Sequence, residues 1–358
     1  MMQNKAVKGW RWLLAAVLFI GIGLLLYGRI SEVLRRKSGT ESDMIHSFYE
    51  VKEDSLDVLF LGSSHLYYGI QPNVLWREYG IAAYDMGSAE QTVASSYFLL
   101  KEAFQYQKPK VVVLESYYLW CPELYHSEAR LRQAFDGMRY GAAKREMVDT
   151  MLPELDWKER LTYYLPFLKY HERWNALEDY DFHTKPYLRG ARIDYTIAPL
   201  EDPGLPTEAS ELPELSLEYL EKIKELCEEH DAEFVLVAIP YGVEIDQDRY
   251  VYQQGMNLAL ETWAKEQEIP FRFYQKDEPE LIDFATDFRD QTHLNTAGAE
   301  KFTADFGAWL AEQYKLENHR ADEAYARYEE DLQKYEADAA AAREHPVDTA
   351  EVVSGAAG

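Results

Sequence analysis

Apolar runs with the length and composition of buried parallel strands recur along this chain, and segments with helical spacing separate them. The clearest run is the last long one, at 234–239, which is entirely apolar and stops at a proline. We expect strands at 57–61, 82–86, 110–114, 234–239 and 271–274. These runs favour a sheet whose strands are covered on both faces.

The segments between the strands have the spacing of amphipathic helices. After Thr92, apolar residues at 93, 97, 100 and 104 share one helical face. We also expect a helical turn at 73–79 and helices at 216–230, 249–267 and 296–314. Alternation of strands and helices implies right-handed crossovers. The predicted fold class is α/β: a flavodoxin-like three-layer α/β/α sandwich with a parallel sheet, whose ligand loops follow the carboxyl ends of the strands.

The strand–helix rhythm is interrupted at 116–215, which we interpret as an insertion in a domain that covers 55–315. The insertion is rich in aromatic residues: Tyr117, Tyr118, Trp120, Tyr125, Tyr140, Trp157, Tyr163, Tyr164, Tyr170, Trp174, Tyr180, Tyr187 and Tyr195. Aromatic rings pack subdomains, and they also stack on sugars and form hot spots in protein interfaces. Both uses remain open for this segment.

The N-terminal region contains an uncharged stretch, 12–28, at the low end of the length that crosses a bilayer core. Basic residues precede it and no small-x-small cleavage site follows, so we expect an uncleaved signal-anchor transmembrane segment at 1–28. A buried globular helix is the alternative. A juxtamembrane linker or helix would follow at 29–54. Basic residues on both sides compete under the positive-inside rule, and we expect a single-pass protein of the cell membrane with its folded domain extracytoplasmic.

Composition excludes some functions and indicates the state of the C-terminal tail. A formal charge of −26 over 358 residues argues against nucleic-acid binding, because phosphate affinity needs clustered Lys and Arg. Cys121 and Cys227 lack metal-ligand spacing, and whether they pair is open; we expect no metal and no cofactor. The acidic, Ala-rich tail at 316–358 has little to bury, so we expect it to begin helical and become disordered.

Two short motifs carry the chemistry. Gly62-Ser63-Ser64 comes directly after the first apolar run, and Asp290 precedes His293 by three residues just before the last helix. A serine hydroxyl needs a base to take its proton, and imidazole titrates near neutrality. A carboxylate on the other ring nitrogen fixes the tautomer. We interpret His65 as a loop or substrate-side group that points away from Ser64.

The pair of motifs resembles the SGNH (GDSL-like) hydrolase superfamily, which has Gly-Asp-Ser after strand one and Asp-x-x-His before the final helix. The resemblance implies that Ser64 is the nucleophile, His293 the base and Asp290 the acid. It also implies an oxyanion hole formed by the backbone N–H groups of Ser64 and of Gly87, which follows strand two. The family's third block, Gly-x-Asn, is not matched, because strand three leads into Glu115-Ser116-Tyr117.

A membrane-tethered fold of this type resembles the acyl-transfer proteins of bacterial surface polymers, those of teichoic acid D-alanylation and alginate O-acetylation. The resemblance implies serine-dependent transfer of an acyl group, an O-acetyl group in the main interpretation, to or from a cell-envelope polysaccharide. Its implied partner is a membrane-bound O-acyltransferase, and esterase action is the same chemistry with water as acceptor. A non-catalytic scaffold that binds glycan or this partner through the insertion is the alternative.

Overall fold

A five-stranded parallel sheet forms the centre of the protein, in the order β2-β1-β3-β4-β5. The computed structural model describes residues 2–35 and 40–344. The strands are β1 (Val58–Gly62), β2 (Ala83–Gly87), β3 (Val111–Glu115), β4 (Glu233–Ala238) and β5 (Phe271–Phe273). Each lies within one residue of its expected bounds, and the predicted α/β fold with a parallel sheet is confirmed.

The two faces of the sheet bury separate apolar clusters, because side chains alternate along each strand. Leu59 and Leu61 of β1 belong to the larger cluster, whereas Val58 and Phe60 belong to the smaller one. Every residue of β1, β2 and β3 is buried, which explains why these strands appear in the sequence as apolar runs without polar alternation.

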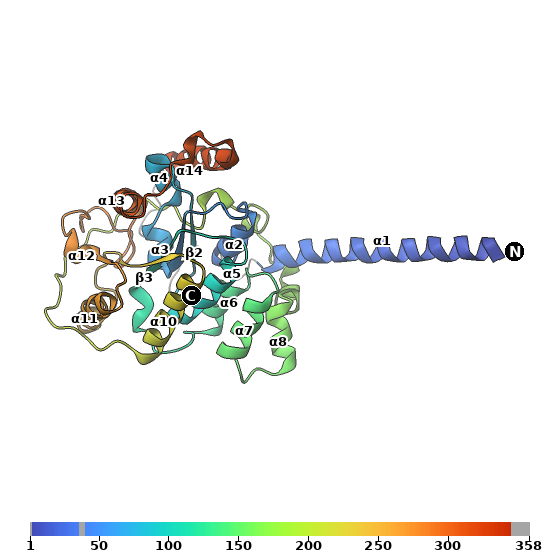
Figure 1. Ribbon diagram of the computed structural model, residues 1–358, viewed down its shortest axis with the longest axis horizontal. Helices are drawn as coiled ribbons and strands as arrows, with labels where there is room; N and C mark the ends of the chain where they lie inside the picture. The colour runs from blue at the N-terminus through green and yellow to red at the C-terminus, as the bar shows by residue number, and fades with distance from the viewer. Residues whose placement is uncertain (1, 36–39, 345–358) are drawn as a thin grey trace.

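Helices cover both faces and complete the three layers (Figure 1). On one face, α13 packs against α3 and α4; on the other, α10 packs against α5. The bounds are α3 (Ser64–Gly69), α4 (Pro72–Tyr79), α5 (Val93–Ala103), α10 (Glu214–Glu229), α11 (Gln247–Glu266), α12 (Tyr274–Asp277) and α13 (Thr296–Tyr314). The helices expected at 73–79, 216–230, 249–267 and 296–314 are all present.

The inserted segment folds into short helices, with no strand among its residues 116–215, all of which lie in the described part of the chain. They are η3 (Tyr117–Trp120), α6 (Glu128–Phe135), α7 (Ala142–Met151), α8 (Trp157–Tyr164), α9 (Phe167–Tyr170), η4 (His171–Asn175), η5 (Asp179–Asp181) and η6 (Pro186–Leu188). Both α6 and α7 pack against α5. Tyr163 and Tyr170 are buried by this packing, whereas Tyr140, Trp157 and Trp174 are exposed. Packing therefore accounts for only part of the aromatic content.

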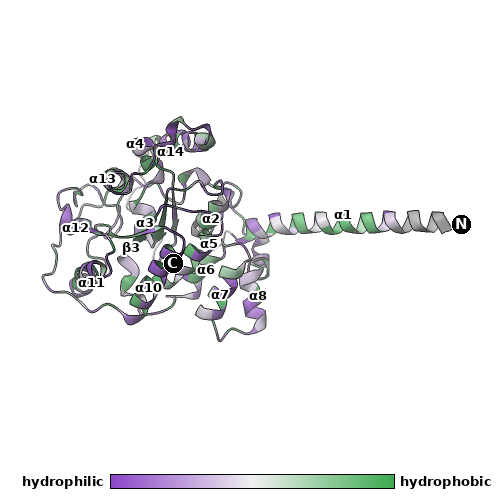
Figure 2. Ribbon diagram, in the orientation of Figure 1, coloured by the Kyte–Doolittle hydropathy of each residue, from purple (hydrophilic) through white to green (hydrophobic). Residues whose placement is uncertain are grey.

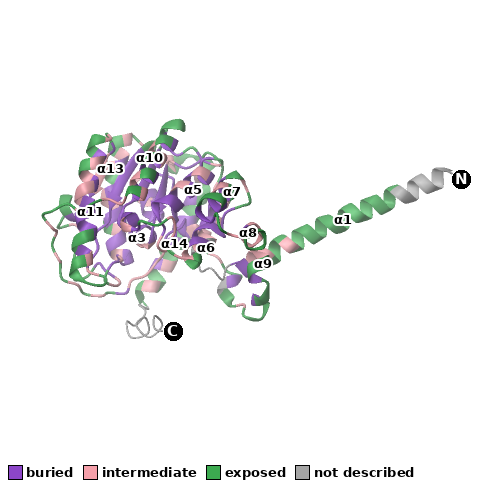
Figure 3. Ribbon diagram, turned by 90° about the horizontal axis from the view of Figure 1, so that it is seen from below, coloured by how far each residue is buried: buried purple, intermediate pink, exposed green. Residues whose placement is uncertain are grey.

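The first helix, α1 (Met2–Arg35), projects from the domain as a rod (Figure 1). By length and composition its Trp10–Arg35 segment is sufficient to cross a membrane, and none of its most apolar window is buried. Figure 2 shows the apolar character of this helix, and Figure 3 shows its exposure. Next come α2 (Thr40–Ser47) and η2 (Phe48–Glu50), where Ile45 and Phe48 are buried. The segment expected as juxtamembrane linker or helix therefore already packs on the domain.

The expectation that the C-terminal tail has little to bury is wrong for its helical part. After the short turns η7 (His319–Ala321) and η8 (Glu323–Tyr325), α14 (Ala326–Glu344) lies against α4 (Figure 1). Its buried side chains are Tyr328, Leu332, Tyr335 and Ala339. Asp331 also forms a buried ion pair with Arg189 of the insertion, at 2.8 Å. The expected disorder falls on 345–358, which lies outside the described residues.

The two cysteines are both free and both buried. Cys227 lies in the larger core cluster, and Cys121 lies in a small aromatic cluster beside Tyr117 and Tyr241. They act as small apolar side chains in these two places.

Candidate active site

A tight turn at the carboxyl end of β1 presents Ser64. The strand ends at Gly62, Ser63 is the N-cap of α3, and its Oγ accepts the amide of His65 at 3.3 Å. Ser64 is the first residue of the helix, and N–H groups in a first turn have no partner inside the helix. The turn thus places the hydroxyl and the backbone N–H of Ser64 at the carboxyl-end edge of the sheet, where ligands of α/β folds bind.

The loop before α13 presents Asp290 and His293 on one turn. Phe288 and Leu294 form an antiparallel bridge, which closes the loop. Inside it, Asp290 Oδ1 accepts the backbone N–H of His293 at 2.9 Å. Asn295 caps α13 by accepting the amide of Gly298 at 3.0 Å, as its place before the helix suggests. The Asp-x-x-His spacing is therefore the spacing of a closed turn.

The structure brings Ser64, His293 and Asp290 into one hydrogen-bonded chain. Ser64 Oγ lies 2.7 Å from His293 Nε2. The other ring nitrogen, Nδ1, lies 2.9 Å and 3.0 Å from the two carboxylate oxygens of Asp290. A proton on Nδ1 that is donated to the carboxylate leaves Nε2 free to accept the hydroxyl proton. This arrangement can activate a serine for attack on an acyl group.

The carboxyl group of Asp290 is held in its ionised form. Burial raises its pKa, but the hydrogen bond and charge of His293 and the amides of Thr292 and His293 outweigh burial and hold the pKa well below its ordinary value. Arg289 adds positive charge, with Nε 3.5 Å from Asp290 Oδ2 and 3.2 Å from Asp194 Oδ2. An ionised acid at this position stabilises a protonated imidazole.

A buried carboxyl group, Glu115, supports the serine turn from the neighbouring strand. Its Oε2 accepts the Ser63 hydroxyl at 2.9 Å and the Ser63 amide at 3.2 Å, and Oε1 accepts the Tyr117 amide. Burial raises the pKa of Glu115 to about 7, against the lowering effect of these hydrogen bonds. A Cβ on Gly62 would lie 2.7 Å from the Glu115 Cβ, so only glycine permits this approach.

The role of Glu115 was missed from the sequence, although a signal was present. A carboxyl residue that directly follows a fully apolar strand lies at the same sheet edge as the residues that follow β1. Here it occupies the place where the resembled family has its Gly-x-Asn block.

The interpretation of His65 as a loop or substrate-side group is wrong. Its ring is buried and stacks on Tyr117, with centroids 3.5 Å apart and planes at 19°. It also lies 4.7 Å from the ring of His293, whose ring is 5.2 Å from that of Tyr68. Burial and the neighbouring His293 hold the pKa of His65 well below its ordinary value. His65 is therefore a neutral ring that supports the imidazole of His293.

Gly87 lies beside the serine turn. It pairs in register with Gly62, and a Cβ on it would lie 3.1 Å from Gly62 O and 3.3 Å from Ser63 O. The next amide, of Ser88, donates to Gly62 O at 3.3 Å. Because backbone N–H groups alternate in direction along a strand, the Gly87 amide is not used in the pairing with β1. Its donation to an oxyanion stays a prediction.

Comparisons with known proteins give little further information. No protein-family model and no curated protein match the chain. Among solved structures, a candidate acylhydrolase from Bacteroides fragilis is similar with a TM-score of 0.39 and 11% identity, over 74% of this chain and 91% of that one. A GDSL-like lipase from Bacteroides thetaiotaomicron has a TM-score of 0.34 and 11% identity, over 72% and 87%.

A cavity of about 370 Å³ lies next to the hydrogen-bonded chain. Tyr68 lines the cavity, and its ring centroid lies 5.2 Å from that of His293. Asp194, the ion-pair partner of Arg289, lines the cavity as well. Apolar walls come from Tyr84 and Leu188. Its volume is in the range of small-molecule sites. Within residues 2–35 and 40–344, no three His, Cys, Asp or Glu side chains are grouped so as to hold a metal ion.

Proposed function

We propose that this protein is a serine-dependent acyltransferase or esterase of the SGNH type, with Ser64 as nucleophile, His293 as base and Asp290 as the orienting acid. The observation that carries the proposal is the continuous chain from Ser64 Oγ through both ring nitrogens of His293 to Asp290, at 2.7 Å and 2.9 Å. Those lengths are within hydrogen-bond reach without a ligand.

The proposed reaction runs in two balanced steps. Ser64 Oγ attacks the carbonyl carbon of an acyl ester, while His293 Nε2 takes the hydroxyl proton and then passes it to the leaving alcohol as the old C–O bond breaks. An acyl ester on Ser64 remains. A second hydroxyl then attacks this ester, its proton goes to His293, and Ser64 oxygen leaves and recovers that proton. The backbone N–H groups of Ser64 and Gly87 are the proposed donors to the developing oxyanion.

The proposed substrate is an O-acyl group, an O-acetyl group first of all, carried to or from a cell-envelope polysaccharide. The apolar α1 supports a site held at a membrane, and the cavity behind Tyr68 offers room for a sugar or an acyl chain. In this proposal the folded domain faces the extracytoplasmic side, and a membrane-bound O-acyltransferase supplies the acyl group. With water as acceptor, the same site acts as an esterase.

A non-catalytic scaffold is the second candidate, and one observation favours it. Glu115 brings a carboxyl group to the place where the resembled family has an amide donor, and a carboxylate cannot donate to an oxyanion. On this alternative, the insertion binds glycan or the membrane partner and Ser64 stays unreactive.

Covalent labelling separates the two candidates. The full-length protein is treated with a fluorophosphonate, and the mass of the intact protein and of the modified peptide is measured. The proposed function predicts one adduct on Ser64, none in Ser64→Ala, and an undiminished adduct in the matched variant Ser210→Ala, whose serine lies in the loop before α10. Absence of any adduct on folded wild-type protein would favour the scaffold.

A further inference from the structure

The insertion exposes a group of large apolar side chains that the fold leaves uncovered. They are Tyr140, Trp157, Leu165, Leu168, Trp174 and Phe182, and the exposed fraction of each exceeds two fifths. All except Tyr140 come from α8, α9 and the 3-10 turns that follow, a stretch of 26 residues from Trp157 to Phe182. Exposed apolar side chains that gather in one short segment indicate a contact with something outside the fold.

The same segment packs against the base of α1. The rings of Tyr27 and Phe167 lie 5.6 Å apart, and α9 contacts α1. Nearer the C-terminal end of α1, the Arg173 guanidinium donates to the carbonyls of Val33 and Leu34 at 3.3 Å and 3.4 Å. Figure 3 shows α8 and α9 beside the point where α1 leaves the domain. These contacts place α9 and the turn that follows it beside residues 27–34 of α1.

That position coincides with the end of the apolar part of α1. Tyr27 belongs to the uncharged stretch 12–28, and Arg29 directly follows it. At 1.5 Å per residue, the seven steps from Tyr27 to Leu34 span about 10 Å, somewhat more than the roughly 5–8 Å of the headgroup region on one side of a bilayer. When α1 crosses a bilayer, Phe167 therefore lies at the boundary between acyl chains and headgroups.

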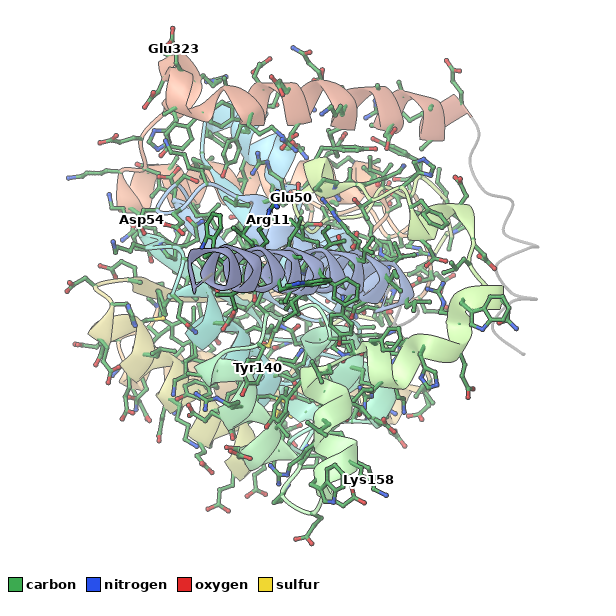
Figure 4. All side chains as sticks on the ribbon, turned by 90° about the vertical axis from the view of Figure 1, so that its right-hand side faces the viewer. Arg11, Glu50, Asp54, Tyr140, Lys158 and Glu323 are labelled. Atoms are coloured by element: carbon green, nitrogen blue, oxygen red, sulfur yellow. The ribbon has the colours of Figure 1, made fainter. Side chains whose placement is uncertain are left out.

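We propose that residues 157–182 form a membrane-contact surface, which lies in the headgroup region of the bilayer that α1 spans. The inference rests on the membrane insertion of α1 and not on the proposed catalysis. Its side chains have the chemistry of that region: Trp157 and Trp174 are amphipathic rings, and Leu165 and Leu168 supply apolar contact. Figure 4 looks along α1 from its N-terminal end and shows Tyr140 and Lys158, together with Glu50 and Asp54, on the side of the domain from which α1 projects.

The contact is made by rings and aliphatic side chains more than by charge. Lys158 Nζ lies 5.7 Å from the Trp157 ring, so one cation accompanies the aromatic anchor. Lys169 is neutralised by Glu128 at 2.8 Å, and Glu159, Glu172 and Asp179 also lie in or beside this segment. Binding is therefore expected to need no anionic lipid. A second contact beside a single helix restricts how far the domain can tilt on the membrane.

Fluorescence quenching tests this surface in the full-length protein. Single cysteines are introduced by Leu168→Cys, Trp174→Cys, Leu18→Cys in α1, and Ile245→Cys as the matched control. Ile245 is exposed to a similar extent and lies two residues before α11, a helix on the side of the domain away from α1 (Figure 1). Native Cys121 and Cys227 are buried, and burial raises the pKa of both thiols. Each protein is labelled with a small fluorophore and reconstituted into phosphatidylcholine vesicles.

We expect lipid spin-labelled near the headgroup to quench the labels at 168 and 174 at least about threefold more than the label at 245. Iodide in the buffer should quench the label at 245 more than those at 168 and 174. The label at 18 should be quenched by lipid spin-labelled deep in the acyl chain. If the label at 18 responds to lipid while those at 168 and 174 behave like 245, the surface is overturned and the anchor stands. Shielding from both quenchers would also overturn it and indicate a protein contact. Labelling of Ser64 by a fluorophosphonate reports the proposed catalysis independently.

Discussion

Ser63 donates its hydroxyl to Glu115 across two neighbouring strands, at 2.9 Å, while the same Ser63 oxygen accepts the amide of His65. The residue before the proposed nucleophile is therefore held by a carboxyl group that the chain supplies 52 residues later. The protonation state of the buried Glu115 carboxyl group therefore affects the hydrogen bonds that hold the serine turn. Ser64, by contrast, directs its Oγ at Nε2 of His293.

The folding stability should depend on pH through Glu115. Burial raises the pKa of its carboxyl group from 4.5 to about 7, so the folded state holds the proton more tightly than the unfolded state. Stability is then lost as pH rises from about 4.5 to about 7, by on the order of 3 kcal/mol for this group. Glu115→Gln cannot titrate, and its free energy of unfolding should fall less over this range.

Urea unfolding at about pH 5 and about pH 8, in one detergent, measures the difference. Other titrating groups contribute equally to both proteins, so the comparison isolates Glu115. Glu123→Gln, near the start of the insertion, serves as an exposed-carboxyl control and should keep the wild-type pH dependence. If the free energy of unfolding of Glu115→Gln changed between the two pH values by as much as that of the wild type, the shifted pKa of Glu115 would be contradicted.

Ser64→Ala and His293→Ala should each remove nearly all hydrolysis of a model ester, a loss of about a thousandfold or more in kcat. Groups that act as a unit are not additive, so the double variant should be little worse than either single one. Asp290→Asn should lose less, if Arg289 and Thr292 keep the loop in place. Release of p-nitrophenol provides the assay. Wild-type activity in Ser64→Ala would refute the nucleophile.

Gly87→Ala should reduce kcat with little change in stability of the sheet. The new methyl group would lie 3.1 Å from Gly62 O and 3.3 Å from Ser63 O, so the serine turn must shift by a few tenths of an ångström. A shift of this kind changes the distance from Ser64 to His293, and catalysis is sensitive to such changes. Gly141→Ala is the matched control, because a Cβ at this position would lie 3.7 Å from its nearest neighbour, Glu102 Oε2, which is ordinary van der Waals contact. Equal activity of the two variants would contradict the prediction.

The tail helix α14 should contribute to folding. Tyr335 is buried, and its hydroxyl donates to Glu300 Oε1 at 3.0 Å. Removal of a large buried ring costs about 3–5 kcal/mol, so Tyr335→Ala should lower the urea midpoint strongly. Tyr252→Ala, at an exposed position of α11, should change the free energy of unfolding by less than about 0.5 kcal/mol. A wild-type midpoint in Tyr335→Ala would mean that α14 docks without stabilising the domain.

The central part of the sheet was predictable because β1, β2 and β3 are buried on both faces. Burial on both faces requires continuous apolar runs such as 111–114, and those runs are local patterns that need no knowledge of partners. The closeness of Asp290 and His293 was predictable for a similar reason. It is a local feature, because Asp290 accepts the backbone N–H of His293 within one turn. Right-handed crossovers determine the face on which each connecting helix lies, whereas the order β2-β1-β3-β4-β5 is known only from the packed sheet.

What the sequence by itself determined, then, is the set of strands, the helix periodicity, the apolar N-terminal helix and the two motifs. Tertiary structure alone decided the contacts between distant segments: Glu115 with Ser63, His65 against Tyr117, and α14 on α4. A charged helix with few apolar residues resembles a disordered tail until the surface that it packs on is known. The contacts of Tyr335 with Glu300 and of Asp331 with Arg189 join α14 to other parts of the chain, and no local pattern in the tail predicts them. The pKa of a carboxyl group likewise depends on burial, which only the packed fold provides.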